Sequence, residues 1–322
     1  MARSSARRSS VTSQLAAIER DGGDGTIHLA RGASLEVTSL GKPYFPQDGV
    51  TKGAIMRHYA ALAPLLLPLL ADRPLALKRY PAGITGKSFY QQNPGDDVPN
   101  DVRVETIRTE DGPAPRLVGG DLATLLYCVQ LGAIAVHPWH SRLAALDSPD
   151  YCLLDLDPGT EAGLAGAVEV ARLARAQLAR WRLRSAVKTS GSTGLHIAIP
   201  LPHGTSYAES AELAEDLATR IARDHPAIAT VERRLADRPP AAVYVDFGQN
   251  ARGKTAASVF SVRARRGAPV SWPLAWRDVG PRLRIERFTV GSVSLAAARR
   301  VAEHWTGVLR RRNTRAAFDA AG

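Results

Sequence analysis

Apolar and polar positions in the second half of the chain follow the periods of strands and helices in turn. The apolar run Tyr151–Leu156 indicates a buried strand, which Pro158 and Gly159 end. Helical spacing of apolar residues over Leu164–Trp181 predicts a crossover helix with arginines on its solvent side. The same spacing rules predict a helix over Ala208–Ala222 and strands over Ala186–Thr189, Leu195–Leu201, Val243–Phe247 and Val259–Arg263.

The first half of the chain is less regular. Apolar residues three to four positions apart over Thr51–Leu70 predict a helix that its two prolines kink or end. Leu75–Tyr80 alternates as a short strand, and Leu122–Leu131 is typical of an apolar helix. The segment Thr109–Gly120 is rich in Gly, Pro and charge, and therefore predicts an exposed loop.

These elements predict a mixed α/β (α+β) fold of two modules. Residues 34–148 would form an N-terminal α/β module, and residues 149–303 a catalytic module. The catalytic order of strand, helix, strand, strand, helix, strand is that of a split βαβ, RNA-recognition-like unit. Residues 1–33 begin with a Ser- and Arg-rich stretch that lacks the apolar run of a secretory signal, so we expect a basic flexible arm. Residues 304–322 are expected to form a basic tail.

Composition narrows the class of protein. The 322 residues include 42 Lys plus Arg against 31 Asp plus Glu, and the net charge of +11 suits a polyanionic partner without identifying it. The two cysteines, Cys128 and Cys152, form no CxxC pair, which argues against a disulfide framework or structural zinc and fits the reducing cytoplasm. The longest apolar run, residues 60–71, is shorter than the ~20 residues of a membrane span, so none is expected.

Three carboxylates are candidates for a metal site. Asp155 and Asp157 lie two positions apart near a strand end, so the period of two places both side chains on one face. Asp246 also ends an apolar strand, and a neighbouring strand would bring it alongside the pair. Hard divalent ions prefer oxygen ligands, and phosphoryl-transfer enzymes use paired ions. The alternative is that Asp-Leu-Asp-Pro-Gly is only a strand ending in a turn, where Asp is common.

The segment Ser190–His196 changes that balance. It places hydroxyls, glycines and a histidine in one turn and strand, and such glycines let backbone amides approach phosphate oxygens. A Ser/Gly turn or a strand histidine alone is more often structural. Together with the carboxylates, this segment predicts a site for a nucleoside triphosphate.

At this point the chain resembles the polymerase domain of bacterial ATP-dependent DNA ligase D, in the archaeo-eukaryotic primase superfamily. The resemblance covers Leu40 to Leu274 and implies a primase-polymerase fold. Its ordered markers are Lys42–Pro46, Lys78–Pro81, Phe89–Gln91, His137–Trp139, Asp155–Pro158, Ser190–His196, and Asp246 with Gln249 and Asn250. Because no ligase or nuclease segment follows, we expect a stand-alone form.

For the active site, the resemblance implies two Mn²⁺ or Mg²⁺ ions held by Asp155, Asp157 and Asp246. It implies that the triphosphate is contacted by Ser190 and His196, with Lys254 and Arg263 as basic helpers and Lys78 and His137 nearby. Ordinary solvated charge is the alternative for Lys254 and Arg263. The stretch Ala257–Phe260 departs from the Ala-Pro-Tyr-Ser of relatives, which could alter a local turn without inactivating the enzyme.

For DNA, the resemblance implies that Lys42 and Lys52 bind the 5′-phosphate of a gap or broken end. Ser39 stands where relatives carry Asn, so an amide donor is lost from that pocket. Phe89 and Tyr90 would stack on a template base, although core packing is the alternative for either ring alone.

The resemblance therefore implies a bacterial, nucleoid-associated nucleotidyltransferase of end joining or gap repair that adds nucleotides, preferring ribonucleotides, to 3′ ends. Its partners would be gapped or broken DNA, nucleoside triphosphates, a Ku-like end-binding protein and a separate ligase. A DNA-end-binding module without catalysis and a metal-dependent phosphoesterase remain alternatives.

Overall fold

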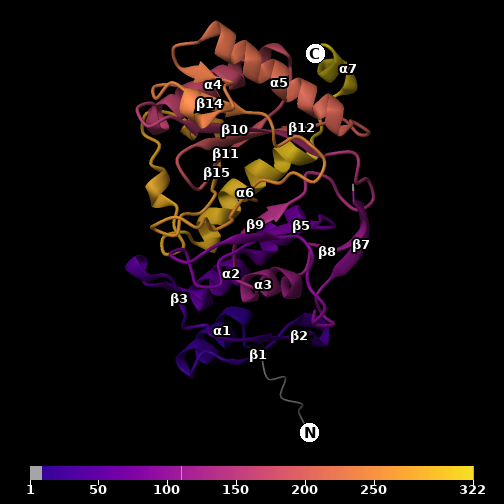
Figure 1. Ribbon diagram of the computed structural model, residues 1–322, viewed down its shortest axis with the longest axis vertical. Helices are drawn as coiled ribbons and strands as arrows, with labels where there is room; N and C mark the ends of the chain where they lie inside the picture. The colour runs from indigo at the N-terminus through magenta and orange to yellow at the C-terminus, as the bar shows by residue number, and fades with distance from the viewer. Residues whose placement is uncertain (1–8, 110, 322) are drawn as a thin grey trace.

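Two hydrophobic cores lie one above the other in the computed structural model, which describes residues 9–109 and 111–321 (Figure 1). The upper core surrounds a six-stranded sheet of order β13–β14–β10–β12–β11–β15, in which only β13 and β14 are parallel. The strands are β10 (Tyr151–Pro158), β11 (Ala186–Thr189), β12 (Leu195–Pro200), β13 (Ala229–Thr230), β14 (Val243–Asp246) and β15 (Pro273–Leu274).

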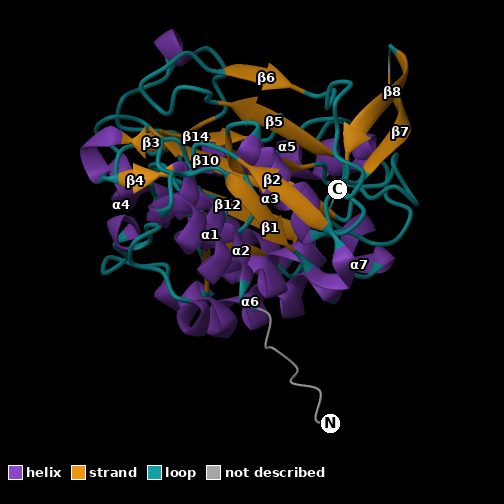
Figure 2. Ribbon diagram, turned by 90° about the horizontal axis from the view of Figure 1, so that it is seen from below, coloured by secondary structure: helices purple, strands orange, loops and turns teal. Residues whose placement is uncertain are grey.

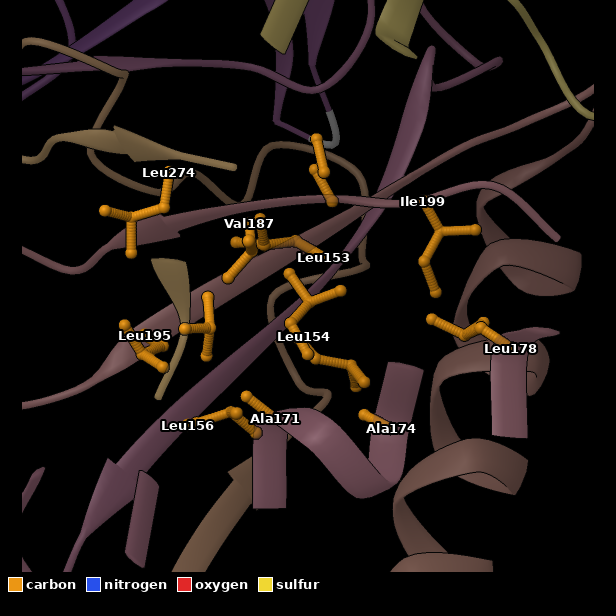
Figure 3. Packing of buried hydrophobic residues seen from close by; sticks show 14 of the residues in the cluster. Leu153, Leu154, Leu156, Ala171, Ala174, Leu178, Val187, Leu195, Ile199 and Leu274 are labelled. Carbon is orange, nitrogen blue, oxygen red and sulfur yellow. The ribbon is translucent and has the colours of Figure 1, made fainter. Parts of the chain in front are cut away.

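Helices α4 (Gly163–Arg180) and α5 (Tyr207–Asp224) pack on one face of this sheet. Figure 3 shows Leu154 and Leu156 of β10 pointing towards Ala171 and Ala174 of α4. Because side chains alternate along a strand, Asp155 then points to the opposite face. The order β10, α4, β11, β12, α5, β14 confirms the predicted split βαβ unit.

The lower core is built around helix α2 (Lys52–Leu70), which continues through both of its prolines. By length and composition α2 could cross a membrane, but its buried apolar side chains pack in the two cores, most of them in the lower one and Leu62 in the upper one, as those of a core helix do. The other elements are α1 (Val11–Arg20), β1 (Gly25–His28), β2 (Ser34–Val37), β3 (Pro43–Phe45), β4 (Val50–Thr51), β5 (Leu75–Arg79), β6 (Phe89–Gln91), β7 (Val104–Thr109), β8 (Gly112–Leu117), α3 (Leu122–Gln130) and β9 (Ala133–Pro138).

The prediction of a flexible arm over residues 1–33 is wrong for residues 9–33, the part that the structure describes. Helix α1 begins at the N-cap Ser10, and β1 pairs with β2, so Leu15 and Ile27 are fully buried. The Ser and Arg content of the first dozen residues hid this apolar spacing. Residues 1–8 of the expected arm lie outside the described residues.

The basic tail expected over residues 304–322 is also folded in its described part, residues 304–321. Helix α6 (Leu295–Arg310) runs through the expected boundary, and α7 (Arg315–Asp319) follows it. Between them Asn313 is buried and donates to the Pro200 carbonyl at 2.8 Å. Seen from below, α6 and α7 lie on the same side of the molecule as α2 (Figure 2). Contacts with β11, β12 and β15 place α6 against the sheet as well.

Two local expectations are corrected. The segment expected as the loop Thr109–Gly120 is largely a hairpin of β7 and β8, because a two-stranded ribbon tolerates prolines at its edges. The strand expected over Val259–Arg263 is instead a turn, in which Phe260 has a φ of 61° and Val262 makes an isolated bridge to Val270.

The two modules are joined by buried hydrogen bonds from α2. The Tyr59 hydroxyl donates to the Ile134 carbonyl at 2.7 Å and accepts from the Val262 amide at 2.9 Å. His58 Nε2 lies 2.8 Å from the Phe260 carbonyl. These bonds hold the 258–263 turn, which leads to Arg263, against the lower core.

Candidate functional site

A row of four polar side chains crosses the sheet on the face away from α4 and α5. Asp246, Asp155, His196 and Lys188 are successive cross-strand partners on β14, β10, β12 and β11. Directly opposed residues of antiparallel strands share a face. The predicted adjacency of Asp246 and Asp155 is therefore confirmed, and the row adds Lys188, which sequence reasoning missed.

His196 connects this row through both ring nitrogens. Its Nε2 lies 3.2 Å from Asp155 Oδ1, and its Nδ1 lies 2.9 Å from Lys188 Nζ. Lys188 Nζ also donates to Ser271 Oγ at 2.7 Å. Because an ionised Asp155 can only accept, the neutral imidazole carries its proton on Nε2 and donates it to Asp155, and Nδ1 accepts from the Lys188 amine.

The charges of the row follow from burial and from each other. Burial lowers the pKa of Lys188 well below its ordinary value, and Arg263 lowers it further. Burial also lowers the pKa of His196, which keeps the ring neutral at neutral pH. Burial alone would raise the pKa of Asp155, but His196, Arg263 and Lys188 outweigh it and lower that pKa. Asp155 is therefore an ionised acceptor.

The other two carboxylates make separate contacts. Asp157 lies 3.5 Å from Arg238 Nη1, yet burial and the charges of Asp155 and Asp246 raise its pKa. Asp246 accepts from the Gly248 amide at 2.8 Å and from Gln249 Nε2 at 3.2 Å.

In the side-chain orientations seen here, no three His, Cys, Asp or Glu side chains of the described residues are grouped to hold a metal ion. The donor set nevertheless fits hard divalent cations, because it consists of carboxylate oxygens on one face. The raised pKa of Asp157 shows that Asp155 and Asp246 are within electrostatic reach of it.

The Ser190–His196 segment is a tight turn between β11 and β12. Ser190 Oγ accepts from the amides of Ser192 at 3.0 Å and Gly194 at 3.2 Å, so it organises the turn. A Cβ at position 194 would lie 1.8 Å from the Leu156 carbonyl oxygen, so only glycine fits there. Arg263 Nη1 donates to the Ser190 carbonyl, which brings its guanidinium to this turn.

Basic side chains gather next to the row. Burial, together with Arg263, Lys188, Lys78 and His196, lowers the pKa of His137 to about 3. His137 and Lys78 therefore lie near the row, on β9 and β5, as predicted. Lys254 differs, because it is exposed and lines another cavity with Tyr90 and Trp139. The structure does not bring Lys254 into contact with the row.

Lys42, Lys52 and Ser39 come together at the start of α2. Lys52 Nζ donates to the Thr38 carbonyl at 2.9 Å, and the Lys42 amide donates to the Ser39 carbonyl at 3.0 Å. Burial and the charge of Lys42 lower the pKa of Lys52 to about 8. Ser39 has a φ of 55°, a conformation that Asn adopts more readily. Sequence reasoning missed Asp24, whose carboxylate accepts from the Ser39 amide at 2.6 Å.

Phe89 and Tyr90 are on the edge strand β6 and are 48% and 70% exposed. The alternative prediction, that one of these rings packs in the core, is therefore wrong for both. As neighbours on a strand they point to opposite faces. Lys78 Nζ lies 5.3 Å from the Tyr90 ring centroid, and Arg79 lies 5.3 Å from that of Phe89. Tyr90 is the ring on the side of Lys78.

Asn250 holds the loop after Asp246 against β10. Its Oδ1 accepts from the Leu153 amide and its Nδ2 donates to the Leu153 carbonyl, both at 2.7 Å. These bonds replace a strand partner for Leu153, two residues before Asp155. Nothing in the spacing of the sequence indicated this pairing.

Asn250→Ala is expected to reduce the free energy of unfolding by about 3 kcal/mol, because it leaves buried backbone groups of Leu153 unpaired. Urea denaturation followed by circular dichroism measures the loss. Gln249→Ala, which removes a single bond to Asp246, is the control and should cost under about 1 kcal/mol. Equal losses in the two variants would contradict the role given to Asn250.

Comparison with known proteins agrees with this geometry. Residues 51–305 match the LigD, primase-polymerase domain family model. The chain is 32% identical over 234 residues to the multifunctional non-homologous end joining protein LigD of Pseudomonas aeruginosa, covering 71% of this chain and 27% of that protein. It is 30% identical over 260 residues to the bifunctional non-homologous end joining protein LigD of Bacillus subtilis, covering 80% and 42%.

The chain thus spans less than half the length of these two relatives. A solved structure described as the polymerase domain from Mycobacterium tuberculosis ligase D in complex with DNA superimposes with a TM-score of 0.76 at 26% identity. The match covers 87% of this chain and 99% of that one, so the folds correspond almost completely. The chain belongs to the LigD primase-polymerase domain family and has its primase-polymerase fold.

Proposed function

We propose that this protein is a nucleotidyltransferase that adds nucleotides to the 3′ end of DNA at gaps and double-strand breaks. The observation that carries the proposal is the row of Asp246, Asp155 and His196 across adjacent strands, with Asp157 on the same face. Phosphoryl transfer requires carboxylates and phosphate-binding groups side by side, and the sheet supplies both.

Each side of the row has its own task in this proposal. The carboxylates of Asp155, Asp157 and Asp246 face the reacting 3′ end. His196, Arg263 and the turn at Ser190 face the triphosphate. The positive charge of Arg263 offsets charge on the phosphate oxygens, whereas the neutral His196 ring and the turn amides can donate hydrogen bonds to them. Lys188 orients His196, and Lys78, which lies near the neutral ring of His137, extends the positive field.

Two divalent cations, Mn²⁺ or Mg²⁺, would be held by Asp155, Asp157 and Asp246. When bound, they supply Lewis-acid stabilisation of the attacking and leaving oxygens. Burial raises the pKa of Asp157, and repulsion from Asp155 and Asp246 raises it further; a bound cation would relieve that repulsion.

DNA end binding would involve two other surfaces. Lys42 and Lys52 would bind the 5′-phosphate, as their convergence beside Ser39 supports. The exposed rings of Phe89 and Tyr90 suit stacking on an unpaired template base.

The cellular setting follows from the relatives, which are named as non-homologous end joining proteins. We propose the same setting here, in the bacterial cytoplasm and at the nucleoid, with a Ku-like protein and a ligase as partners.

Primer extension tests the function. A labelled primer on a template with a short 5′-phosphorylated gap is incubated with MnCl₂ or MgCl₂ and with ribo- or deoxyribonucleoside triphosphates. Lengthening of the primer supports the proposal, and faster addition of ribonucleotides supports the expected sugar preference. Binding without lengthening would support an end-binding module instead, and shortening would support a phosphoesterase.

Affinity for 5′-phosphorylated gaps is expected to fall about tenfold between pH 7 and pH 9. The pKa of Lys52 is about 8 in the free protein, and a bound phosphate would raise it. Binding therefore takes up a proton once the pH exceeds 8, and weakens as the pH rises. Fluorescence anisotropy measures this.

Two controls belong to that measurement. Unphosphorylated gaps should show no such slope, and Lys52→Met should bind phosphorylated gaps weakly at every pH. Lys42→Ala should likewise weaken phosphorylated more than unphosphorylated gaps. Equal losses on both DNAs would remove the phosphate assignment.

Ser39→Asn should bind phosphorylated gaps at least as well as wild type, because Asn suits the positive φ and adds an amide donor.

A further inference from the structure

An arginine-rich cavity lies between α2, α6 and the beginning of β10. Its volume is about 220 Å³. One side carries Arg142, Arg312 and, at the rim, Arg310, whereas Leu69, Trp305 and Leu309 form an apolar side. Lys188 contributes to the wall, but its Nζ is bonded to His196 and Ser271. The cavity therefore adjoins the catalytic row without including its carboxylates.

On the cationic side of the cavity, the guanidinium groups outnumber the carboxylates that neutralise them. Asp150 is the carboxylate that lines it, and it forms ion pairs with Arg73, Arg142 and Arg312 at once. The side chain of Arg73 is only 4% exposed. Three guanidiniums around one carboxylate leave a local excess of two positive charges. The side chains of Arg142 and Arg312 are 34% and 25% exposed, so an anion can reach them.

Two of these guanidiniums have N–H groups to offer. Arg142 donates through Nε and Nη1, and Arg312 through Nη1 and Nη2, to protein acceptors among the described residues. A guanidinium carries five N–H donors in a planar fork that matches phosphate oxygens. Arg142 and Arg312 can therefore hold a phosphate while keeping Asp150. The Thr306 side chain also lines the cavity and adds a hydroxyl.

We propose that this cavity binds a small organic phosphate monoester, with its phosphate on Arg142 and Arg312 and its apolar part against Trp305 and Leu309. The apolar side favours an organic phosphate over a free inorganic one, because an ion alone would leave that side without a partner. The site is separate from the nucleotide site of the proposed function and does not depend on it.

Isothermal titration calorimetry of the full chain tests the proposal, with phenyl phosphate as the probe and inorganic phosphate and phenol as the comparison ligands. Phenyl phosphate should bind in a 1:1 ratio, about tenfold or more tighter than either comparison ligand. Leu309→Trp, which fills the apolar side, should weaken this binding about tenfold. Leu309→Trp leaves the ion pairs of Asp150 with Arg73, Arg142 and Arg312 in place, so we expect this variant to fold.

A matched pair of arginines sharpens the test. Arg310→Gln should weaken binding of phenyl phosphate several-fold, because Arg310 lines the cavity rim. Arg311→Gln removes the neighbouring exposed charge, which does not line the cavity, and should leave binding unchanged. His196→Ala should also leave it unchanged. Binding that His196→Ala removes and that Arg310→Gln and Leu309→Trp retain would place the ligand in the catalytic row and overturn the proposal, as would absence of binding.

Discussion

Asp155→Asn is expected to reduce nucleotide addition by about a thousandfold or more, which corresponds to about 4 kcal/mol of transition-state stabilisation. Asparagine keeps the shape of the side chain and can still accept from His196 Nε2, so the row stays in place. The charge at the centre of the carboxylate group is lost, and with it the strongest attraction for divalent cations. Single-turnover primer extension measures the loss.

The same variant should keep its fold and its grip on DNA. Binding of gapped DNA, measured by anisotropy, should change less than twofold, since Asp155 is not among the phosphate or stacking residues. Asp216→Asn is the matched control, because Asp216 lies on α5, on the covered face, and pairs only with Arg220 among the described residues. If Asp155→Asn retained a tenth or more of wild-type activity, the carboxylate row would not be the catalytic centre.

Lys188→Met is expected to reduce nucleotide addition about 10- to 100-fold, the usual effect of losing the partner that orients a catalytic imidazole. Lys188 fixes the tautomer of His196 and lowers its pKa. Without that charge the pKa of His196 rises, so the ring is protonated at a higher pH than in wild type. The acid side of the pH–rate profile should therefore move to higher pH.

The shift of the pH–rate profile distinguishes a role of Lys188 in positioning His196 from a simple loss of structure. Methionine matches the lysine in length, but His196 Nδ1 and Ser271 Oγ lose their donor, so the variant should fold with a free energy of unfolding about 1–3 kcal/mol lower. The shifted pH–rate profile is a readout that this loss of stability alone would not produce. Arg180→Met, which removes an exposed charge at the end of α4, should leave both rate and profile unchanged. A Lys188→Met enzyme with a reduced rate and an unshifted profile would show that Lys188 does not act through His196.

The face that carries the carboxylates could be predicted because it depends on local periods. The period of two in β10 put Asp155 and Asp157 on one face, and the alternation of strands and helices gave the topology that set Asp246 beside them. Lys188 was missed because one lysine in an otherwise apolar strand has no periodic signature. One signal was available. Strands β11 and β12 were expected to be joined by a turn, and counting back from that turn places Lys188 opposite His196.

Other features depend on contacts that no local pattern encodes. The Arg238 contact to Asp157 joins segments far apart in the chain, and the Asp24 contact to Ser39 depends on the pairing of β1 with β2, which was not expected. Helix α1 was not predicted because its short apolar pattern directly follows a Ser- and Arg-rich stretch that is typical of a flexible arm. The β7–β8 hairpin was mistaken for a loop because its glycine and prolines are breakers inside a sheet but are tolerated in a two-stranded ribbon.

Helix α2 has a consequence for which breaks in DNA this protein would fill. Lys52 lies in its first turn, and Tyr59, about two turns further on, is bonded to Val262 beside Arg263. One continuous helix thus spans from the lysine proposed to bind the DNA end to the neighbourhood of the proposed nucleotide site. A spacer of constant length cannot follow the two ends of a strand as they move apart, so missing stretches of a few nucleotides would fit and long ones would not.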